Sequence, residues 1–302
     1  MAVPTRTHFP RTSGARSWVD TSYRVYEPNQ GNIIYAHSSG AGGTTGGRSP
    51  EDAVTTADAA VDLAVASNND LVLVLAGHTE ALIAAGTLTV DKAGVHVIGG
   101  GVGRERPVFT YTTAVGASCD VTAADCMLKN LVFSAIGFDA VTAAINISAA
   151  DCWVHDCELE LADGTNQAVL GILTTASANR LWINKCHIHG TPDAGTAAGI
   201  RIVGGNEIRI TDNFIWGNYT TSLGGIDNVT TAMLRAIIKG NAIGNLTAAS
   251  TVAINAVATS TGTIARNDLC ILMGTAPIVA AGMYWVGGNY YANAVATAGT
   301  LI

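Results

Sequence analysis

One repeat constrains the fold of this chain more than any other feature of its sequence. Apolar residues recur in two columns, three positions before and two positions after a polar or small residue, at steps of 22 to 29 residues. The residues between the two columns are Asn130, Cys157, Cys186, Asn213, Asn241, Asn267 and Asn289. A period of this length predicts a solenoid, in which each repeat packs only on its neighbours.

A separate column of isoleucines supports the same period. It consists of Ile145, Ile172, Ile200, Ile226 and Ile254. The repeats contain short β-type segments separated by Gly, Thr, Ala, Ser and Asn, and no long helical period. The sequence therefore predicts an all-β fold, a right-handed parallel β-helix whose coils lie about 4.8 Å apart.

The column that contains Asn213 is expected at a corner between two strands. Stacked Asn side chains can hydrogen-bond their copies in the coils above and below, and Asn tolerates the left-handed turn conformation. Cys157 and Cys186 are expected to replace Asn there as small apolar side chains.

Composition excludes several classes of protein. A charged fraction of 13% with 34 glycines fits a solenoid with tight turns. The net charge of −7 argues against nucleic-acid binding, and no apolar run reaches 18 residues, so we expect no membrane span. The N-terminus lacks the apolar segment of a signal peptide, so we expect no secretion by that route. We expect the cysteines to be buried free thiols, which fits synthesis of the protein in a reducing cytoplasm. The cysteines are Cys119, Cys126, Cys152, Cys157, Cys186 and Cys270.

The sequence divides into three parts. Residues 1–30 form an extended arm, residues 31–70 a strand, a Gly-rich loop and a helix, and residues 71–302 the β-helix. Ser49 as N-cap and Pro50 at the first helical position predict a helix over about residues 50–67. This helix is expected to cap the first coil, because the open end of a solenoid exposes core and unpaired strand edges.

The arm differs in charge from the rest of the chain. Its four arginines against Asp20 and Glu27 give +2, which leaves −9 for the other residues. Arginine and aromatic residues are enriched in interface hot spots, so we expect the arm to bind a partner, with a disordered tail as the alternative. The expected contact residues are Arg6, Phe9, Arg11, Arg16, Trp18, Tyr23, Arg24 and Tyr26.

The order of strand, Gly-rich loop and capping helix in GNIIYAHSSGAGGTTGGRSPEDAV resembles the start of the pectate-lyase-like β-helix superfamily. The resemblance extends over about residues 33–291, and it implies the fold more than the function, since this fold carries lyases, hydrolases, adhesins and virion proteins. The polar arm and the acidic, Thr-, Ala- and Gly-rich body look similar to bacteriophage virion proteins.

The repeat also predicts one patch on an outer face. Glu158, His187, Phe214 and Asp268 share one position, and Glu160, His189 and Trp216 share the position two residues further on. Such a group could bind a divalent metal or perform acid–base chemistry. Without the clustered carboxylates of a lyase or hydrolase, we expect only weak cross-strand Glu–His pairs, with no catalytic residue, metal or cofactor.

Arg104 and Arg106 are expected to decorate a loop between early coils.

These features predict a virion structural protein, not an enzyme. We expect a capsid decoration or cement protein of a bacteriophage, made in the host cytoplasm and attached through its arm to the major capsid protein or another virion protein. A homotrimer is expected, because an exposed sheet face can pack around a threefold axis. The alternative is a β-helix that binds or cleaves a glycan, such as a tailspike or a polysaccharide lyase or hydrolase.

Overall fold

The computed structural model describes residues 31–43, 45–190, 195–219, 224–246, 252–271, 277–293 and 300–301. The predicted arm and its eight contact residues lie outside the described residues.

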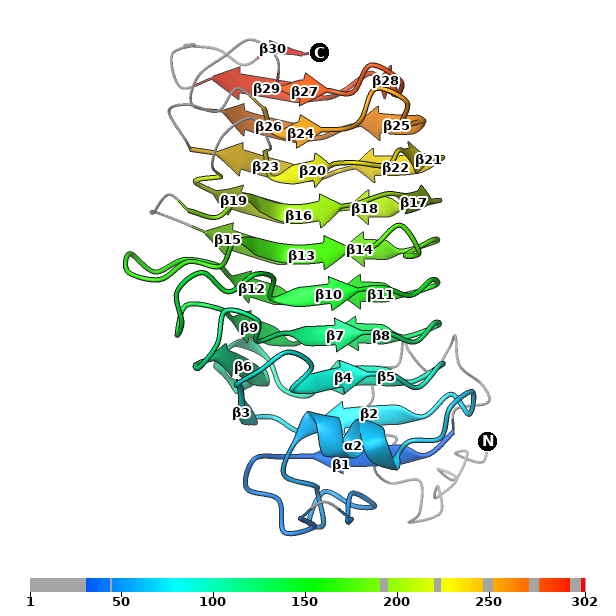
Figure 1. Cartoon of the computed structure of the whole chain (residues 1–302), viewed down its shortest axis with the longest axis vertical. Helices are drawn as coiled ribbons and strands as arrows, with labels where there is room; N and C mark the ends of the chain where they lie inside the picture. The colour runs from blue at the N-terminus through cyan, green and yellow to red at the C-terminus, as the bar shows by residue number, and fades with distance from the viewer. Residues whose placement is uncertain are drawn as a thin grey trace, which may run out of the picture.

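Three long sheets stack along one axis and form a parallel β-helix (Figure 1). Each coil runs from a strand of sheet A through a strand of sheet B to a strand of sheet C, and then enters the next coil. The coils stack from β1 at one end to β29 at the other (Figure 1). The all-β parallel solenoid expected from the repeat is therefore present.

The strands of the three sheets are short. Sheet A contains β1 (Ile33–Ala36), β2 (Leu71–Val74), β5 (His96–Gly99), β8 (Met127–Lys129), β11 (Trp153–His155), β14 (Trp182–Asn184), β18 (Arg209–Thr211), β22 (Ala236–Lys239), β25 (Gly262–Ala265) and β28 (Tyr284–Val286). Sheet B contains β3 (Thr79–Leu82), β6 (Val108–Tyr111), β9 (Val132–Ser134), β12 (Glu158–Glu160), β15 (His187–Gly190), β19 (Phe214–Gly217), β23 (Ala242–Asn245), β26 (Asp268–Ile271), β29 (Tyr290–Asn293) and β30 (Thr300–Leu301). Sheet C contains β4 (Leu88–Val90), β7 (Cys119–Val121), β10 (Ile145–Ile147), β13 (Leu170–Thr174), β16 (Ala198–Ile202), β20 (Ile226–Asn228), β24 (Ile254–Asn255) and β27 (Ile278–Val279).

Small elements complete the fold. The strands β17 (Gly205–Asn206) and β21 (Met233–Leu234) form a two-stranded parallel sheet, and η2 (Gly103–Glu105) is a 3₁₀ turn. Among the described strands, the pair β29–β30 is antiparallel. No helix in the described ranges is both long and apolar enough to cross a membrane.

The predicted isoleucine column is confirmed in sheet C. Ile145, Ile172 and Ile200 pair in register, and Ile226 and Ile254 continue the column. All five side chains are buried. Burying an isoleucine stabilises a fold by about 1.5–3 kcal/mol, so these stacked columns form much of the core.

A column of side-chain amides lies at the corner between sheets A and B. Oδ1 of Asn241 accepts from the backbone N of Asn213 at 3.0 Å and from its Nδ2 at 2.9 Å. The same pair of bonds joins Asn241 to Asn267 and Asn267 to Asn289. Each Nδ2 also donates to a backbone carbonyl of the preceding coil, as Asn241 does to Ile210 O at 2.9 Å. The four buried amides therefore hold successive coils in one register.

Cysteine makes part of the same contact at two places in this column. Sγ of Cys157 lies 3.6 Å from Leu128 O, and Sγ of Cys186 lies 3.6 Å from Val154 O. Leu128 and Val154 stand in register with Ile183 and Ile210, whose carbonyls accept from the side chains of Asn213 and Asn241. The thiol is therefore a weak donor in the position of an amide, and not only a small apolar side chain.

The predicted register is wrong by one residue at Asn130. Leu128 pairs with Val154, so Leu131 and not Asn130 stands level with Cys157. Asn130 has a φ of 56° and occupies the left-handed position just before the column. Its Nδ2 donates to the carbonyls of Gly99 and Gly101 in the preceding coil. The Asn ladder residues themselves are not left-handed; residues such as Asp212 and Gly240 before them are.

A similar slip affects the last coil. Trp285, and not Val286, pairs with Ile264, although Asn289 keeps its place in the amide column. The two glycines Gly287 and Gly288 supply the extra length between the strand and the corner.

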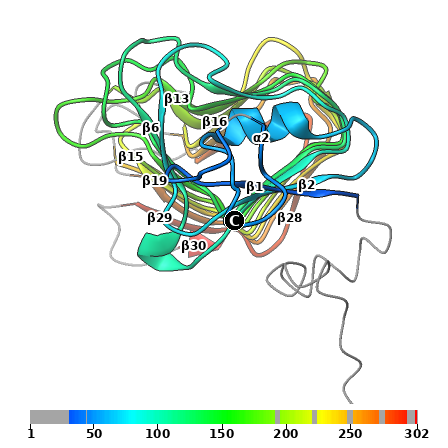
Figure 2. The same cartoon turned by 90° about the horizontal axis from the view of Figure 1, so that it is seen from below.

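The helix α2 (Ala57–Leu63) starts later than the predicted residue 50. Val54 instead forms a β-bridge with Ala36, and Thr56 is the N-cap, accepting from Ala59 N at 3.2 Å. Glu80 of the following coil accepts from Ala57 N at 2.8 Å, which satisfies another free amide of the first turn. The helix packs on β1, β2 and β4 and lies across the end of the coil (Figure 2).

The amide column yields a direct test of what fixes the coils. Replacing Asn241 with Ala leaves the donors of Asn213 and the carbonyl of Ile210 unpaired in a buried site, so we expect a loss of about 3 kcal/mol of unfolding free energy. Asn241→Cys should cost clearly less, since a thiol can donate to Ile210 O as Cys186 donates to Val154 O. Guanidinium unfolding of both variants measures the difference. A loss of less than about 1 kcal/mol for Asn241→Ala would contradict this role of the column, whereas equal losses for Ala and Cys would contradict only the donor role of the thiol.

Candidate functional site on the outer face of sheet B

The candidate site is built by three adjacent strands of sheet B. Alternation along a strand sends Leu159, Ile188 and Ile215 into the core and their neighbours outward. The register places Glu158 beside His187 and His187 beside Phe214. Two residues further on, His189 stands between Glu160 and Trp216, as the repeat predicts. The outer face therefore carries a carboxylate strand, an imidazole strand and an aromatic strand.

Glu158 is the centre of the polar part. Its Oε2 accepts from Nη1 of Arg106 at 3.0 Å. Its Oε1 lies 3.4 Å from Nε2 of His189 and 3.9 Å from Nδ1 of His187. One carboxylate oxygen is thus held by a guanidinium while the other is directed at both imidazoles.

Glu160 and His187 also have defined surroundings in the site. Oε2 of Glu160 accepts from Oγ of Ser134 at 2.6 Å. Partial burial, followed by the nearby His189, lowers the pKa of His187. The lowered pKa favours a neutral His187 near neutral pH, and a neutral imidazole can act as a base or as a metal ligand.

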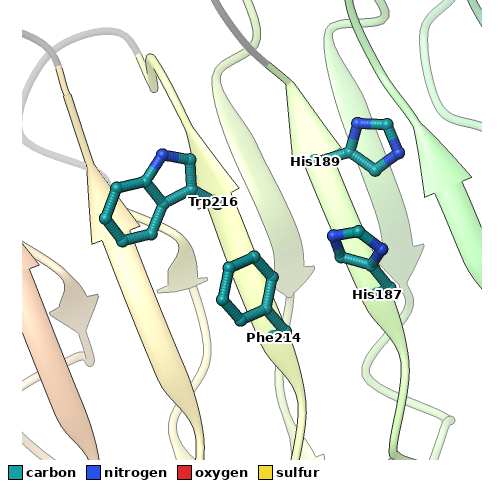
Figure 3. Close-up of a pocket in the computed structure, with 4 residues that line it drawn as sticks. All are labelled: His187, His189, Phe214 and Trp216. Carbon is teal, nitrogen blue, oxygen red and sulfur yellow. The ribbon is translucent and has the colours of Figure 1, made fainter.

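The aromatic part is a flat surface. The rings of Phe214 and Trp216 lie 6.0 Å apart and nearly parallel, at 12°. His187 packs edge-on against Phe214 with the ring centroids 5.1 Å apart. These two rings, with His187 and His189, line a shallow open depression (Figure 3).

A glycine in the next coil allows the Trp216 ring to lie down on the sheet. Gly244 pairs with Trp216, and a Cβ at Gly244 would collide with the indole ring. Any larger residue at position 244 would force the ring away from the sheet.

Arg106 lies in the loop before β6, as the sequence predicts, but its side chain is not a free surface decoration. Its side chain is only 15% exposed, and Nη2 donates to the carbonyls of Leu131 and Asp156 at 3.1 and 2.8 Å. Arg106 therefore joins three consecutive coils and positions Glu158. The residue precedes a strand and stands outside the repeat, so no periodic signal marks it.

The other predicted positions do not join this site. The amide column, with Cys157 and Cys186, is buried at the corner between sheets A and B and has the structural contacts described above. Five of the six cysteines are buried and Cys270 is half-buried, all as free thiols. Within the described ranges, Glu158, His187 and His189 are the one group of three metal-ligating side chains whose donor atoms lie within 4.8 Å of one another.

Comparison with known proteins shows similarity in fold and not in sequence. No protein-family model and no curated protein matches the chain. A rhamnogalacturonan lyase superposes with a TM-score of 0.51 at 11% identity, over 80% of this chain and 74% of its own. The pectate lyase Pel9A has a TM-score of 0.38 at 13% identity, over 89% and 80%. ORF18 of Geobacillus virus E2 has a TM-score of 0.31 at 11% identity, over 96% and 65%.

The likeness to the rhamnogalacturonan lyase supports the expected parallel β-helix fold. It says nothing of activity at this identity, and the two lower scores carry no argument.

The buried contacts of Arg106 predict a clear stability effect. Arg106→Ala removes charge-assisted bonds to Glu158 and to two backbone carbonyls, so we expect a loss of about 2–3 kcal/mol. Arg180 is a matched control, because its ion pair with Asp151 is 53% exposed on the arginine side, and Arg180→Ala should therefore cost clearly less than Arg106→Ala. Unfolding in guanidinium measures both losses, and equal losses would contradict the structural role of Arg106.

Proposed function

We propose that this protein is a structural component of bacteriophage particles, a decoration protein that attaches to the capsid through residues 1–30. The observation that carries the proposal is the contrast between the arm and the body. The arm has a charge of +2 with four aromatic residues, whereas the body has a charge of −9. A cationic aromatic segment can bind a neighbouring protein while the acidic body stays soluble and projects outward.

The direction of the rod fits this proposal. Strand β1 begins at Ile33 and lies at the α2 end of the stack, opposite the last coils (Figure 1). A segment that precedes residue 31 therefore enters the rod at that end. In the proposed arrangement this end faces the particle, and the C-terminal coils point away from it.

The chemistry of the body fits a passive role. Burial raises the pKa of the Cys157 thiol to about 12 and that of Cys126 to about 11, so both thiols stay protonated and unreactive. The polar column at the corner of the coils is engaged in holding the stack together. The proposal therefore assigns no catalytic step to this chain.

The proposal names the partner and the assembly. The partner is the major capsid protein or another virion protein, the place is the virion after synthesis in the host cytoplasm, and the decoration protein is a homotrimer. Closed cyclic symmetry is the usual state of such assemblies, and a threefold axis lets three arms bind at once.

Full-length protein with Arg6, Arg11, Arg16 and Arg24 changed to Gln tests the arm. We expect this variant, and the chain lacking residues 1–30, to keep the β-helix circular dichroism of the wild type but to lose attachment to particles. Sedimentation with purified particles measures occupancy, and sedimentation equilibrium measures the trimer. Arg209→Gln, which changes an exposed arginine on β18 of the body, is the control and should bind normally. Full occupancy by the arm variants would refute the arm as the attachment site.

A second function is favoured by one specific observation, the exposed aromatic surface of Phe214 and Trp216 beside polar groups. Glycan sites combine aromatic surfaces with a few convergent polar side chains. The outer face of sheet B has this composition, and it is the place where this chain would bind a host sugar.

Trp216→Ala and Gly244→Ala test that second function. Both remove the flat ring from the face, the first by deletion and the second by a collision. If the face binds a glycan, each variant should lose at least about fivefold in affinity for a capsular or cell-wall oligosaccharide, since a stacked ring contributes about 1 kcal/mol or more. Tyr284→Ala, an exposed aromatic residue on sheet A, is the control and should bind as the wild type. Absence of oligosaccharide binding by the wild type would exclude the function.

A further inference from the structure

Three side chains on two neighbouring strands of sheet B have the donor atoms of a metal site. His187 and His189 stand two residues apart on β15, so both point to the same outer face, and Glu158 lies beside them on β12. Their donor atoms are Nδ1 of His187, Nε2 of His189 and Oε1 of Glu158. Two imidazoles and one carboxylate are a ligand set that divalent transition metals accept.

The distances fit a small ion with little movement. Zn²⁺ bonds nitrogen and oxygen ligands at about 2.0–2.2 Å, so two ligand atoms of a tetrahedral site lie about 3.3 Å apart. Oε1 of Glu158 is 3.4 Å from Nε2 of His189 and 3.9 Å from Nδ1 of His187. All three donor atoms lie within 4.8 Å of one another, so small rotations of surface side chains close the site.

The surroundings hold the donors in this arrangement. Arg106 binds the other oxygen of Glu158 and leaves Oε1 directed at the imidazoles. Phe214 packs edge-on against His187 and restricts its ring. Nε2 of His189 is itself buried and makes no hydrogen bond with any described residue, so it is available to an ion.

The charges around the site are also compatible with a cation. The guanidinium of Arg106 neutralises Glu158 in part, which weakens any metal site. Glu160, on the same strand, supplies a second negative charge close to His187. The cluster thus has two carboxylates against one guanidinium.

We propose that Glu158, His187 and His189 bind one divalent transition metal ion, with Zn²⁺ as the best fit. The fourth coordination position is open, because the three side chains lie on an outer face and each is partly exposed. The bound ion links β12 to β15 across two coils. This assignment replaces the expectation from sequence of unassisted Glu–His pairs, and it does not depend on attachment to a virion or on glycan binding.

The test uses the full chain after treatment with a chelator. Titration with ZnCl₂ in a calorimeter should give one site per chain, and titration with CoCl₂ should give the visible absorption bands of a four-coordinate Co²⁺ ion. His187→Ala and His189→Ala should each weaken Zn²⁺ binding by at least about tenfold, and the double variant should abolish it. Glu158→Gln should weaken it by about tenfold, since the amide keeps the shape but loses the charge.

Two controls make the result specific. Glu160→Gln removes the same charge from the same strand while the three donors stay in place, so it should change affinity less than Glu158→Gln. His37→Ala removes a histidine outside the site and should leave binding unchanged. All variants change partly exposed side chains, and unaltered circular dichroism should show that they fold. A wild type that binds no Zn²⁺ at millimolar concentration, or a double histidine variant that still binds it, would overturn the proposal.

Discussion

The hydrogen bond from the backbone amide of one coil to a side-chain amide of the next is the constraint on which this structure depends. Asn213, Asn241 and Asn267 each donate their backbone N–H to the Oδ1 of the Asn one coil further on. At this corner the strands of sheets A and B have ended, and no strand partner is there to accept the bond. A buried donor without a partner costs about 1–3 kcal/mol, so each Asn protects the stack at a point where sheet pairing fails.

The register set at that corner decides which side chains share the outer face of sheet B. Side chains alternate along a strand, so a slip of one residue would turn Ile188 outward and His187 inward. With the observed register, Glu158, His187 and Phe214 form one row, and Glu160, His189 and Trp216 form the next. The candidate site is thus a consequence of the stacking, and it needs no separate loop to bring its residues together.

Much of this arrangement could be predicted from the sequence, because solenoid repeats convert sequence spacing directly into contacts. The isoleucine column of sheet C and the rows of the outer face follow from the period alone. The prediction of the amide column failed at Asn130, because an asparagine suits two adjacent positions of the corner. Asn130 fits the left-handed turn as well as the column, and only the pairing of Leu128 with Val154 distinguishes them. The helix was predicted too early, because Ser49 and Pro50 carry the local signal for a helix start, whereas Val54 pairs with Ala36 and Thr56 is the actual cap.

Arg106 and Gly244 illustrate what the period cannot supply. Arg106 reaches Glu158 from a loop two coils earlier, three coils before His187, and its role depends on a side-chain path that no spacing encodes. Gly244 matters because of the ring that lies on it, which is a question of shape. Arg106 positions the carboxylate of Glu158, and Gly244 leaves room for the ring of Trp216 on the outer face. The proposed metal-binding and sugar-binding face is therefore compatible with the proposed structural role, because the core of the rod does not depend on it.

Hydrogen exchange at the corner amides tests the central claim of this account most directly. The backbone amides of Cys186, Asn213, Asn241 and Asn267 have side-chain acceptors and lie outside the strands. If the amide column holds the register, these four amides should exchange as slowly as those of the central strands, because they open only when the stack opens. Exchange as fast as that of the exposed turn at residues 112–116 would show that the column does not hold the coils together.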